Sequence, residues 1–289
     1  MNMIMALPGN EAFAERLAAA RGGVVTPLET RRFPDGESYV RVVADVAGRG
    51  VDLVATQADP DRGFLRLMFA ARALRELGAA SVNLIAPYLG YMRQDARFNP
   101  GEAETSRTFA DLISGAFDQL VTVDPHLHRH PTLETIYAIP CLTLHAAPLM
   151  ADWIRANVDA PLIVGPDVES AQWVSAIAAR ADAPYAVLTK QRLGDRDVRV
   201  SLPDLAAHRG RKAVVIDDIA SSGRTLVAAA EALAKQDFTL PTCLVVHALF
   251  VGDAFEAVSA VMQQVVSTDS ISHPSNTIGL APLIAGAFG

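Results

Sequence analysis

The sequence predicts an α/β protein of two tandem domains, each a mainly parallel sheet flanked by helices. Short apolar runs rich in β-branched residues alternate with alanine-rich stretches of helical character, which is the order typical of parallel sheets. The apolar runs are continuous, as expected for strands that are buried on both faces. The pattern occurs twice in 289 residues, once in the first half and again from about Pro161.

Each domain has its own set of expected elements. The expected strands are Val51–Thr56, Ser81–Ala86, Leu120–Val123, Pro161–Val164, Tyr185–Leu188, Lys212–Ile216 and Thr242–His247. The expected helices are Glu11–Ala20, Phe64–Leu77, Ser106–Ser114, Ala146–Asn157, Ser170–Arg180, Thr225–Lys235 and Phe255–Met262. We expect domains at residues 1–146 and 147–289, with Ile139–Met150 as the passage between them. Whether the last residues return to the first domain stays open.

The net charge, the cysteines and the apolar runs of the chain argue against several classes of protein. A net charge of −7 argues against a protein that grips nucleic acid along a basic face. Cys141 and Cys243 lie far apart and form no CxxC, so we expect neither a disulfide framework nor a zinc site. The apolar start, Met1–Pro8, is short and has no basic leader, and no apolar run is long enough to span a bilayer. We therefore expect a reduced, cytoplasmic protein that does not bind membranes.

A phosphate-binding loop is predicted after the strand that begins at Lys212. The strand ends in Asp217 and Asp218, small residues follow, and a helix is expected from Thr225. Backbone N–H groups at a helix N-terminus suit a phosphate monoester. The paired carboxylates suit ribose hydroxyls, or a metal reached through water. The alternative is an ordinary strand–loop–helix turn with an acidic start.

Two N-terminal segments suggest a nucleotide site. After the strand Ser81–Ala86, Arg93 and Arg97 could clamp polyphosphate oxygens, while Gln94 and Asp95 could contact adenine or ribose. The alternative is a solvated charged loop.

The other segment, Arg32–Ser38, carries Phe33, Asp35 and Glu37 around a glycine. By itself it is a weak signal, because Pro-Asp-Gly also forms common turns. The alternative is therefore a plain hairpin turn.

A divalent-metal site is suggested after the strand Leu120–Val123. Asp124 and His126 place a carboxylate and an imidazole close together in sequence. Three histidines in this run could instead indicate zinc. For His128 and His130 we expect a solvated loop.

Two further loops follow strands of the second domain. Asp167 comes directly after Pro161–Val164 and could contact sugar or metal, and a helix N-terminus is expected at Ser170. Lys190 and Arg192 lie in a polar loop that could close over a site. The alternative for this pair is a solvated basic loop.

Together, these motifs resemble those of the ribose-phosphate pyrophosphokinase (PRPP synthetase) family. The resemblance implies two phosphoribosyltransferase-like domains, ATP and ribose 5-phosphate as substrates, Mg²⁺ as cofactor, and a homo-oligomer, either a dimer or a hexamer. It implies that Lys190 and Arg192 are catalytic, and that Asp124 and His126 bind the metal. The implied ATP-binding residues are Phe33, Asp35, Glu37, Arg93, Gln94 and Asp95. The implied ribose-phosphate-binding residues are Asp167, Asp217, Asp218, Ser221, Ser222, Gly223, Arg224 and Thr225.

The sequence also departs from the family pattern. Ser221 stands where the family usually has an acid, and Arg224 stands where it has glycine. Two further acids expected around Ile139–Pro140 are absent. Two alternatives therefore stay open, namely a catalytically weak regulatory subunit and a phosphoribosyltransferase that uses PRPP.

Overall fold

The computed structural model describes residues 2–127, 129–167, 170–192, 198–201 and 203–288. Contacts divide the chain into two units. Unit 1 consists of Met1–Leu144, Ser270–Ser272 and Leu280–Gly289, and unit 2 consists of His145–Asp269 and His273–Gly279. The domain boundaries expected from the sequence stay a prediction.

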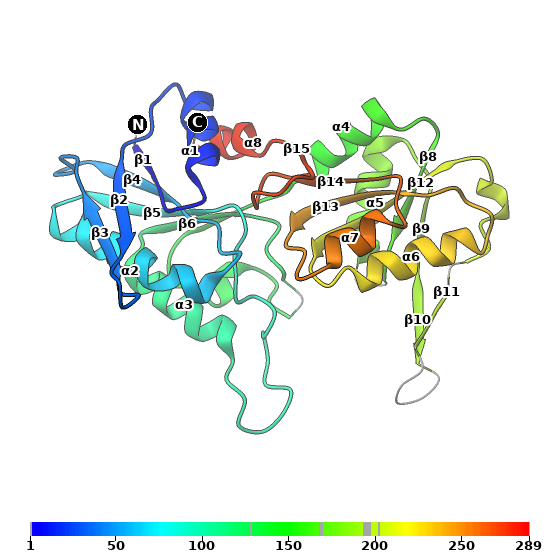
Figure 1. Cartoon of the computed structure of the whole chain (residues 1–289), viewed down its shortest axis with the longest axis horizontal. Helices are drawn as coiled ribbons and strands as arrows, with labels where there is room; N and C mark the ends of the chain where they lie inside the picture. Colours follow the sequence, from blue (N-terminus) through cyan, green and yellow to red (C-terminus); the bar gives the residue numbers. More distant parts are fainter. Residues whose placement is uncertain (1, 128, 168–169, 193–197, 202, 289) are drawn as a thin grey trace. The chain divides into compact units, whose positions relative to one another are not determined.

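Unit 1 is built on a five-stranded parallel sheet in the order β1-β4-β5-β6-β7. The strands are β1 (Met3–Ala6), β4 (Gly50–Val54), β5 (Ser81–Ala86), β6 (Gln119–Val123) and β7 (Cys141–Leu144). The helices are α1 (Glu11–Ala20), α2 (Pro60–Glu76), α3 (Thr105–Ala116) and α8 (Ala281–Gly286), with a short 3₁₀ helix, η1 (Leu133–Thr135). In Figure 1, α1 and α8 lie together on one face of this sheet, and α2 and α3 lie on the other.

The core of unit 1 follows from helical periodicity. In α2, the buried residues Leu67, Ala70, Ala71 and Leu74 recur at the spacing of one helix face. They pack in one cluster with the continuous apolar strands, as the sequence predicted. A separate antiparallel hairpin, β2 (Leu28–Arg32) and β3 (Ser38–Val42), packs beside α2.

Unit 2 has a six-stranded parallel sheet in the order β15-β14-β13-β12-β8-β9. The strands are β8 (Pro161–Gly165), β9 (Tyr185–Val187), β12 (Lys212–Ala220), β13 (Thr242–Ala248), β14 (Gln264–Thr268) and β15 (Asn276–Ile278). The helices are α4 (Ala147–Asn157), α5 (Ala171–Ala181), α6 (Arg224–Ala234) and α7 (Ala254–Ser259), with a 3₁₀ helix, η3 (Ala206–His208). A hairpin of β10 (Thr189–Arg192) and β11 (Val198–Ser201) is separate from the sheet.

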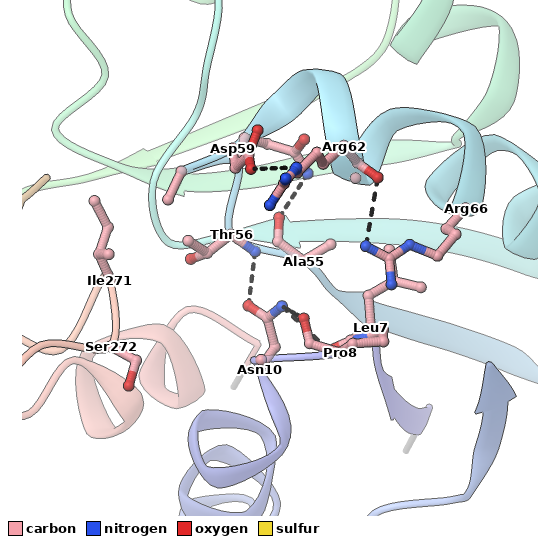
Figure 2. A pocket seen from close by; sticks show the side chains of 14 residues that line it. Leu7, Pro8, Asn10, Ala55, Thr56, Asp59, Arg62, Arg66, Ile271 and Ser272 are labelled. Carbon is pink, nitrogen blue, oxygen red and sulfur yellow. Dashed lines mark hydrogen bonds and ion pairs between the residues drawn. The ribbon is translucent and has the colours of Figure 1, made fainter. Parts of the chain in front are cut away.

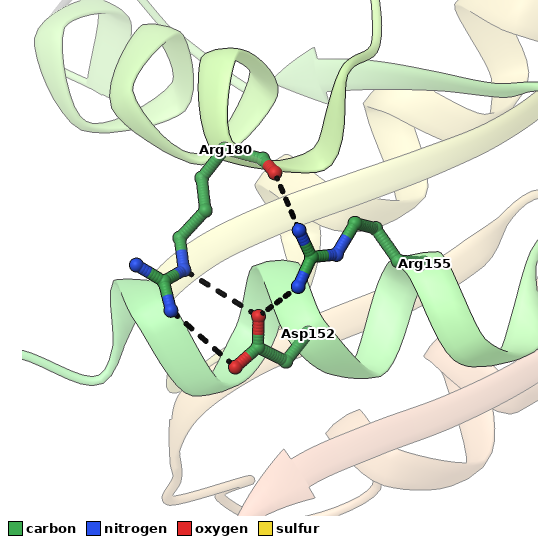
Figure 3. Close-up of polar contacts among 3 residues, drawn as sticks. All are labelled: Asp152, Arg155 and Arg180. Atoms are coloured by element: carbon green, nitrogen blue, oxygen red, sulfur yellow. Dashed lines mark hydrogen bonds and ion pairs between the residues drawn. The ribbon is translucent and has the colours of Figure 1, made fainter.

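Helices α4 and α5 are joined by an exposed ionic cluster (Figure 3). Asp152 binds Arg155 of its own helix at 2.7 Å and Arg180 of α5 at 3.4 Å. All three side chains are about half exposed, so each pair contributes little to stability.

The structure contains elements that were not expected, among them two short strands of unit 1. The passage Ile139–Met150 contains β7, an edge strand with half-buried side chains, and the apolar start contains β1. Both strands are only four residues long, too short for a clear pattern. Both cysteines are free, as predicted. None of the helices in the described part of the chain is both long enough and apolar enough to cross a bilayer.

Candidate functional site

Unit 2 brings three acidic side chains to one edge of its sheet. Strand β12 pairs in parallel with β8, with Val215 opposite Val164. Asp167 is the second residue after β8, while Asp217 and Asp218 lie near the end of β12. Because parallel strands end at the same edge, these carboxyl groups are neighbours, and the charge of Asp167 acts on Asp217.

Asp217 has an unusual acidity. Burial raises its pKa well above the ordinary value, and the charges of Asp218 and then Asp167 raise it further. The Asp218 amide donates to Asp217 Oδ1 at 3.0 Å, and the Ile219 amide donates to Asp218 Oδ1 at 2.8 Å. The raised pKa favours the protonated form of Asp217 relative to an ordinary carboxyl, and the neighbouring carboxyl groups offer acceptors to a ligand rich in hydroxyl groups.

The loop after β12 is held in a shape that only glycine suits. Gly223 has φ of 69°, and a Cβ there would lie 2.6 Å from Cγ2 of Val258 in α7. The loop is tied down where the Val251 amide donates to the Ser221 carbonyl at 3.0 Å. Helix α6 starts at Arg224, one residue before the expected Thr225, and Gly223 supplies no side-chain cap. Its first amide groups therefore remain available to an anion.

Ser222 and Arg224 are exposed beside this loop. Arg224 therefore places an exposed positive charge close to a predicted phosphate position.

Unit 1 brings together the loops after β5 and β6, which are adjacent strands. Arg129 Nη1 donates to Asp95 Oδ1 at 2.7 Å, and the Asp95 side chain is only 2% exposed. Arg129 also lies over the Phe98 ring, 5.0 Å from its centroid. Arg93 and Arg97 are exposed, and Gln94 is half-buried. The two arginines are therefore accessible to a ligand, whereas Asp95 holds the loop in place.

The loop after β5 is also packed closely against the loop after β4. A Cβ on Gly90 would lie 2.9 Å from the Gln57 carbonyl oxygen, and the Gln57 amide donates to the Tyr88 carbonyl at 2.9 Å. Tyr91 has φ of 58°, and its hydroxyl donates to Asp61 at the start of α2. These contacts fix the path of the chain just before Arg93.

Asp124 and His126 follow β6 and are half-buried. Asp124 has φ of 37°, and its amide donates to the Leu144 carbonyl at 2.9 Å. Within the described residues, no group of three or more His, Cys, Asp and Glu side chains could hold a metal by itself. The expectation of a solvated His130 is wrong, because this residue is 7% exposed where the chain turns into η1. His128 lies outside the described residues.

The comparisons with known proteins agree across the chain. Residues 2–116 match the model of the N-terminal domain of ribose phosphate pyrophosphokinase, and residues 132–279 match the phosphoribosyl transferase domain. The chain is 34% identical over 285 residues to a ribose-phosphate pyrophosphokinase of Methanothermobacter thermautotrophicus, with 98% of each chain covered. The chain belongs to the ribose-phosphate pyrophosphokinase family.

Other members of this family are also similar. The ribose-phosphate pyrophosphokinase of Methanopyrus kandleri is 30% identical over 288 residues, covering 99% of this chain and 98% of the relative. The crystal structure of phosphoribosylpyrophosphate synthetase from Mycobacterium smegmatis has a TM-score of 0.87 at 22% identity, covering 99% of this chain and 97% of that one. The last comparison confirms the predicted fold of two phosphoribosyltransferase-type domains.

In this pyrophosphokinase-family chain, Phe33, Asp35 and Glu37 occupy the tip of the β2–β3 hairpin. The Phe33 amide donates to the Glu37 carbonyl at 2.8 Å, and the Glu37 amide donates to Asp35 Oδ1 at 3.1 Å. The Arg31 guanidinium lies 4.4 Å from the Phe33 ring centroid. Within the described residues, the hydrogen bonds and ring contacts of the tip stay inside the hairpin. The hairpin therefore presents an exposed aromatic side chain.

Lys190 and Arg192 lie on β10 of a hairpin, where the sequence predicted a loop. Lys190 is opposite Val200, and Arg192 is opposite Val198. Residues 193–197, between the two strands in sequence, lie outside the described residues, as do Val168 and Glu169.

Sequence reasoning missed Arg129, the partner of Asp95. Its signal was present, because a basic residue in the loop after one strand and an acid in the loop after its neighbour can pair. The pairing becomes evident only once β5 and β6 are known to be adjacent.

Proposed function

We propose that this chain transfers the pyrophosphoryl group of ATP to the 1-hydroxyl of ribose 5-phosphate, giving PRPP and AMP for nucleotide biosynthesis. The observation that carries this proposal is the pair Asp217–Asp218, which leads directly into the uncapped N-terminus of α6. Carboxyl groups for sugar hydroxyls thus lie next to amide groups for a phosphate. The family membership supports the same reaction.

Ribose 5-phosphate has a natural orientation in unit 2. Its 5-phosphate is proposed to bind the amide groups of the segment from Ser221 to Thr225, with Arg224 adding charge. Asp217 and Asp218 hold ribose hydroxyls, with Asp167 beside them. The raised pKa of Asp217 makes its protonated form, which can donate a hydrogen bond, more accessible than in an ordinary carboxyl.

ATP is proposed to bind through Arg93 and Gln94, with Asp95 held by Arg129 behind them. Phe33, Asp35 and Glu37 are proposed to contact the nucleotide of a neighbouring subunit in a homo-oligomer, either a dimer or a hexamer. The exposed Phe33 ring, 38% accessible, suits such a contact. The composition and the two free cysteines favour a cytoplasmic location.

Magnesium fits the donors of unit 1 only as an ion that arrives with the nucleotide. Mg²⁺ in phosphoryl-transfer sites usually takes one or two carboxylates together with waters and substrate phosphates. Asp124 offers one carboxylate, and His126 a nitrogen that can contact a coordinated water. When bound, the ion would neutralise phosphate charge.

The reaction itself relies on positioning. A bond forms between the ribose O1 atom and the β-phosphorus, while the bond from that phosphorus to the oxygen bridging the α-phosphate breaks. AMP leaves with the bond's electron pair, and the hydroxyl proton is released. Lys190 and Arg192 are proposed to oppose the charge that develops on the transferred group.

The test is to incubate the pure protein with ATP, magnesium and ribose 5-phosphate and to measure AMP by chromatography. AMP formation that requires the sugar phosphate is expected. Lys190→Ala should lower turnover about a hundredfold or more while leaving the melting temperature nearly unchanged. Nucleotide binding without AMP would instead indicate a regulatory subunit. Turnover only with PRPP and a base would indicate a phosphoribosyltransferase.

A further inference from the structure

Unit 1 contains a pocket of roughly 360 Å³ that none of the proposed substrate residues lines. It lies at the carboxyl ends of the adjacent strands β1 and β4, where open parallel sheets commonly bind ligands. Figure 2 shows residues from the segment just before α1 and from the start of α2 around it, with Ile271 and Ser272 at one side. The volume is sufficient for a small metabolite.

The pocket has a positive side. Arg62 and Arg66, one turn apart on α2, both line it, and the N-terminus of α2 adds the positive end of the helix dipole. The Asp59 side chain does not cap this helix, and Pro60 has no N–H to satisfy. Asp59 offsets part of the charge through a loose, exposed contact with Arg62 at 3.7 Å.

Arg66, which lines this pocket, carries an unsatisfied hydrogen-bond donor. Its Nη2 atom donates to the Arg62 carbonyl at 3.4 Å, a long bond that Figure 2 shows. Its Nε atom is buried and has no hydrogen-bond partner among the described residues. A buried N–H of a charged group without an acceptor is costly, so a rotation of the Arg66 side chain toward an anion in the pocket would give this group the acceptor that it lacks.

Gly63 lies between the two arginines and lines the same pocket. A Cβ built on it would meet nothing within 4 Å, and its backbone is not left-handed. Neither packing nor conformation therefore requires glycine here, although glycine weakens a helix relative to alanine. Because Gly63 has no side chain, the backbone of α2 is uncovered where this residue lines the pocket.

The other walls of the pocket suit the uncharged part of a ligand. Leu7, Pro8 and Ile271 provide apolar surface. Asn10 is held in place, since its Oδ1 accepts from the Thr56 amide at 2.8 Å, as Figure 2 shows. We propose that this pocket binds the phosphate group of a small phosphorylated metabolite, with Arg62 and Arg66 on the phosphate and the apolar wall against the rest.

A ligand bound in the pocket would also affect the loop after β5, which is proposed to bind the nucleotide. Gln57 lines the pocket, and its amide holds the Tyr88 carbonyl, while Gly90 packs on its backbone. A ligand that orders the segment after β4 therefore also orders the loop that leads to Arg93.

The test uses hydrogen exchange with mass spectrometry on the full chain in phosphate-free buffer. Inorganic phosphate, ribose 5-phosphate and AMP are added separately. At least one should slow exchange in residues 55–69. Protection by inorganic phosphate shows that the phosphate group alone is sufficient for binding. Protection by only one of the two esters, ribose 5-phosphate or AMP, identifies the organic group that the apolar wall accepts.

Two matched variants isolate the charge. Gly63→Asp places a carboxylate beside the arginines and should weaken binding about tenfold or more. Gly63→Asn has the same size without the charge and should bind nearly as the unmodified protein does. Arg66→Gln should also weaken binding about tenfold, while protection of residues 217–228 by ribose 5-phosphate persists in all three. If no probe protects residues 55–69, or if Gly63→Asp and Gly63→Asn behave alike, the proposal is overturned.

Discussion

Arg129 Nη1 lies 2.7 Å from Asp95 Oδ1, and this ion pair joins the loop after β5 to the loop after β6. Arg129 is half exposed, but Asp95 is buried, so Arg129→Ala would leave a buried carboxylate unpaired. We expect a loss of about 1–3 kcal/mol in the free energy of unfolding, measured with urea. We also expect a several-fold higher KM for ATP, because the loop carries Arg93.

Arg107 provides the control for this variant. It pairs with Glu104 on the surface of α3, so Arg107→Ala should change stability by less than about 1 kcal/mol. Equal effects of the two substitutions would show that the Asp95 pair is no more than a surface contact.

The acidity of Asp217 predicts a pH dependence. Its pKa is raised in the folded state, so between the ordinary carboxyl value and this higher one the folded protein keeps a proton that the unfolded chain has lost. Stability is therefore lost as the pH rises through this window. Asp217→Asn should have a higher melting temperature than the unmodified protein at pH 7 and a smaller difference near pH 4, while its AMP formation falls about a hundredfold.

Asp152→Asn serves as the reference for the pH series, because Asp152 is an exposed carboxylate. A melting curve for Asp217→Asn that parallels that of the unmodified protein from pH 4 to 8 would contradict the assignment.

Gly223 predicts a measurable coupling with Val258. Gly223→Ala places a methyl group 2.6 Å from Val258 Cγ2 and forces alanine to adopt φ of 69°. We expect a loss of about 1–3 kcal/mol, of which the left-handed backbone alone accounts for about 1 kcal/mol. In a Val258→Ala background the same change should cost less, and a double-mutant cycle of unfolding free energies measures the difference. If the two losses of unfolding free energy are strictly additive, the clash between the added methyl group and Val258 must be relieved by movement of other parts of the chain.

The hairpin tip predicts complementation between subunits. Phe33 is exposed, so Phe33→Ala should leave the melting temperature unchanged while raising the KM for ATP about tenfold. If the tip serves a neighbour's nucleotide, mixing Phe33→Ala with Lys190→Ala under conditions that exchange subunits should restore part of the activity. Activity equal to the sum of the separate variants would indicate that each chain uses its own tip.

The Asp152 cluster predicts a small effect. Arg155 and Arg180 are each about half exposed, so Asp152→Asn should cost about 0.2–1 kcal/mol, and less in 1 M salt. Urea unfolding at two salt concentrations measures this. A salt-independent loss above about 2 kcal/mol would show that the cluster organises the α4–α5 packing.

Much of the fold could be predicted because periodicity is a local property. The bounds of α1 and β5 agree with the expectation. Helix α2 begins at Pro60, four residues before the expected Phe64, because proline suits the first helical turn. Strand β12 continues through Asp217 and Asp218 to Ala220, because pairing with β13 supports polar residues that its apolar pattern excluded.

What could not be predicted depends on strand order. The Asp95–Arg129 pair and the pocket beside Arg66 require knowing which strands are neighbours, and no local pattern gives that. His130 was misjudged for a different reason, since Leu133, three residues further on, is buried in the core and the segment between them follows it inward. Most of the sites proposed from motifs lie at or just after strand ends, but Lys190 and Arg192 lie on strand β10.

Helix α8 belongs to unit 1 although it lies at the far end of the chain. It packs on α1, and its Ile284 is fully buried there, while the Arg21 guanidinium lies over the Phe288 ring. During synthesis on the ribosome, the first sheet therefore emerges long before the helix that covers one side of α1. The surface of α1 that α8 covers therefore stays exposed in the nascent chain until the whole of unit 2 has been translated.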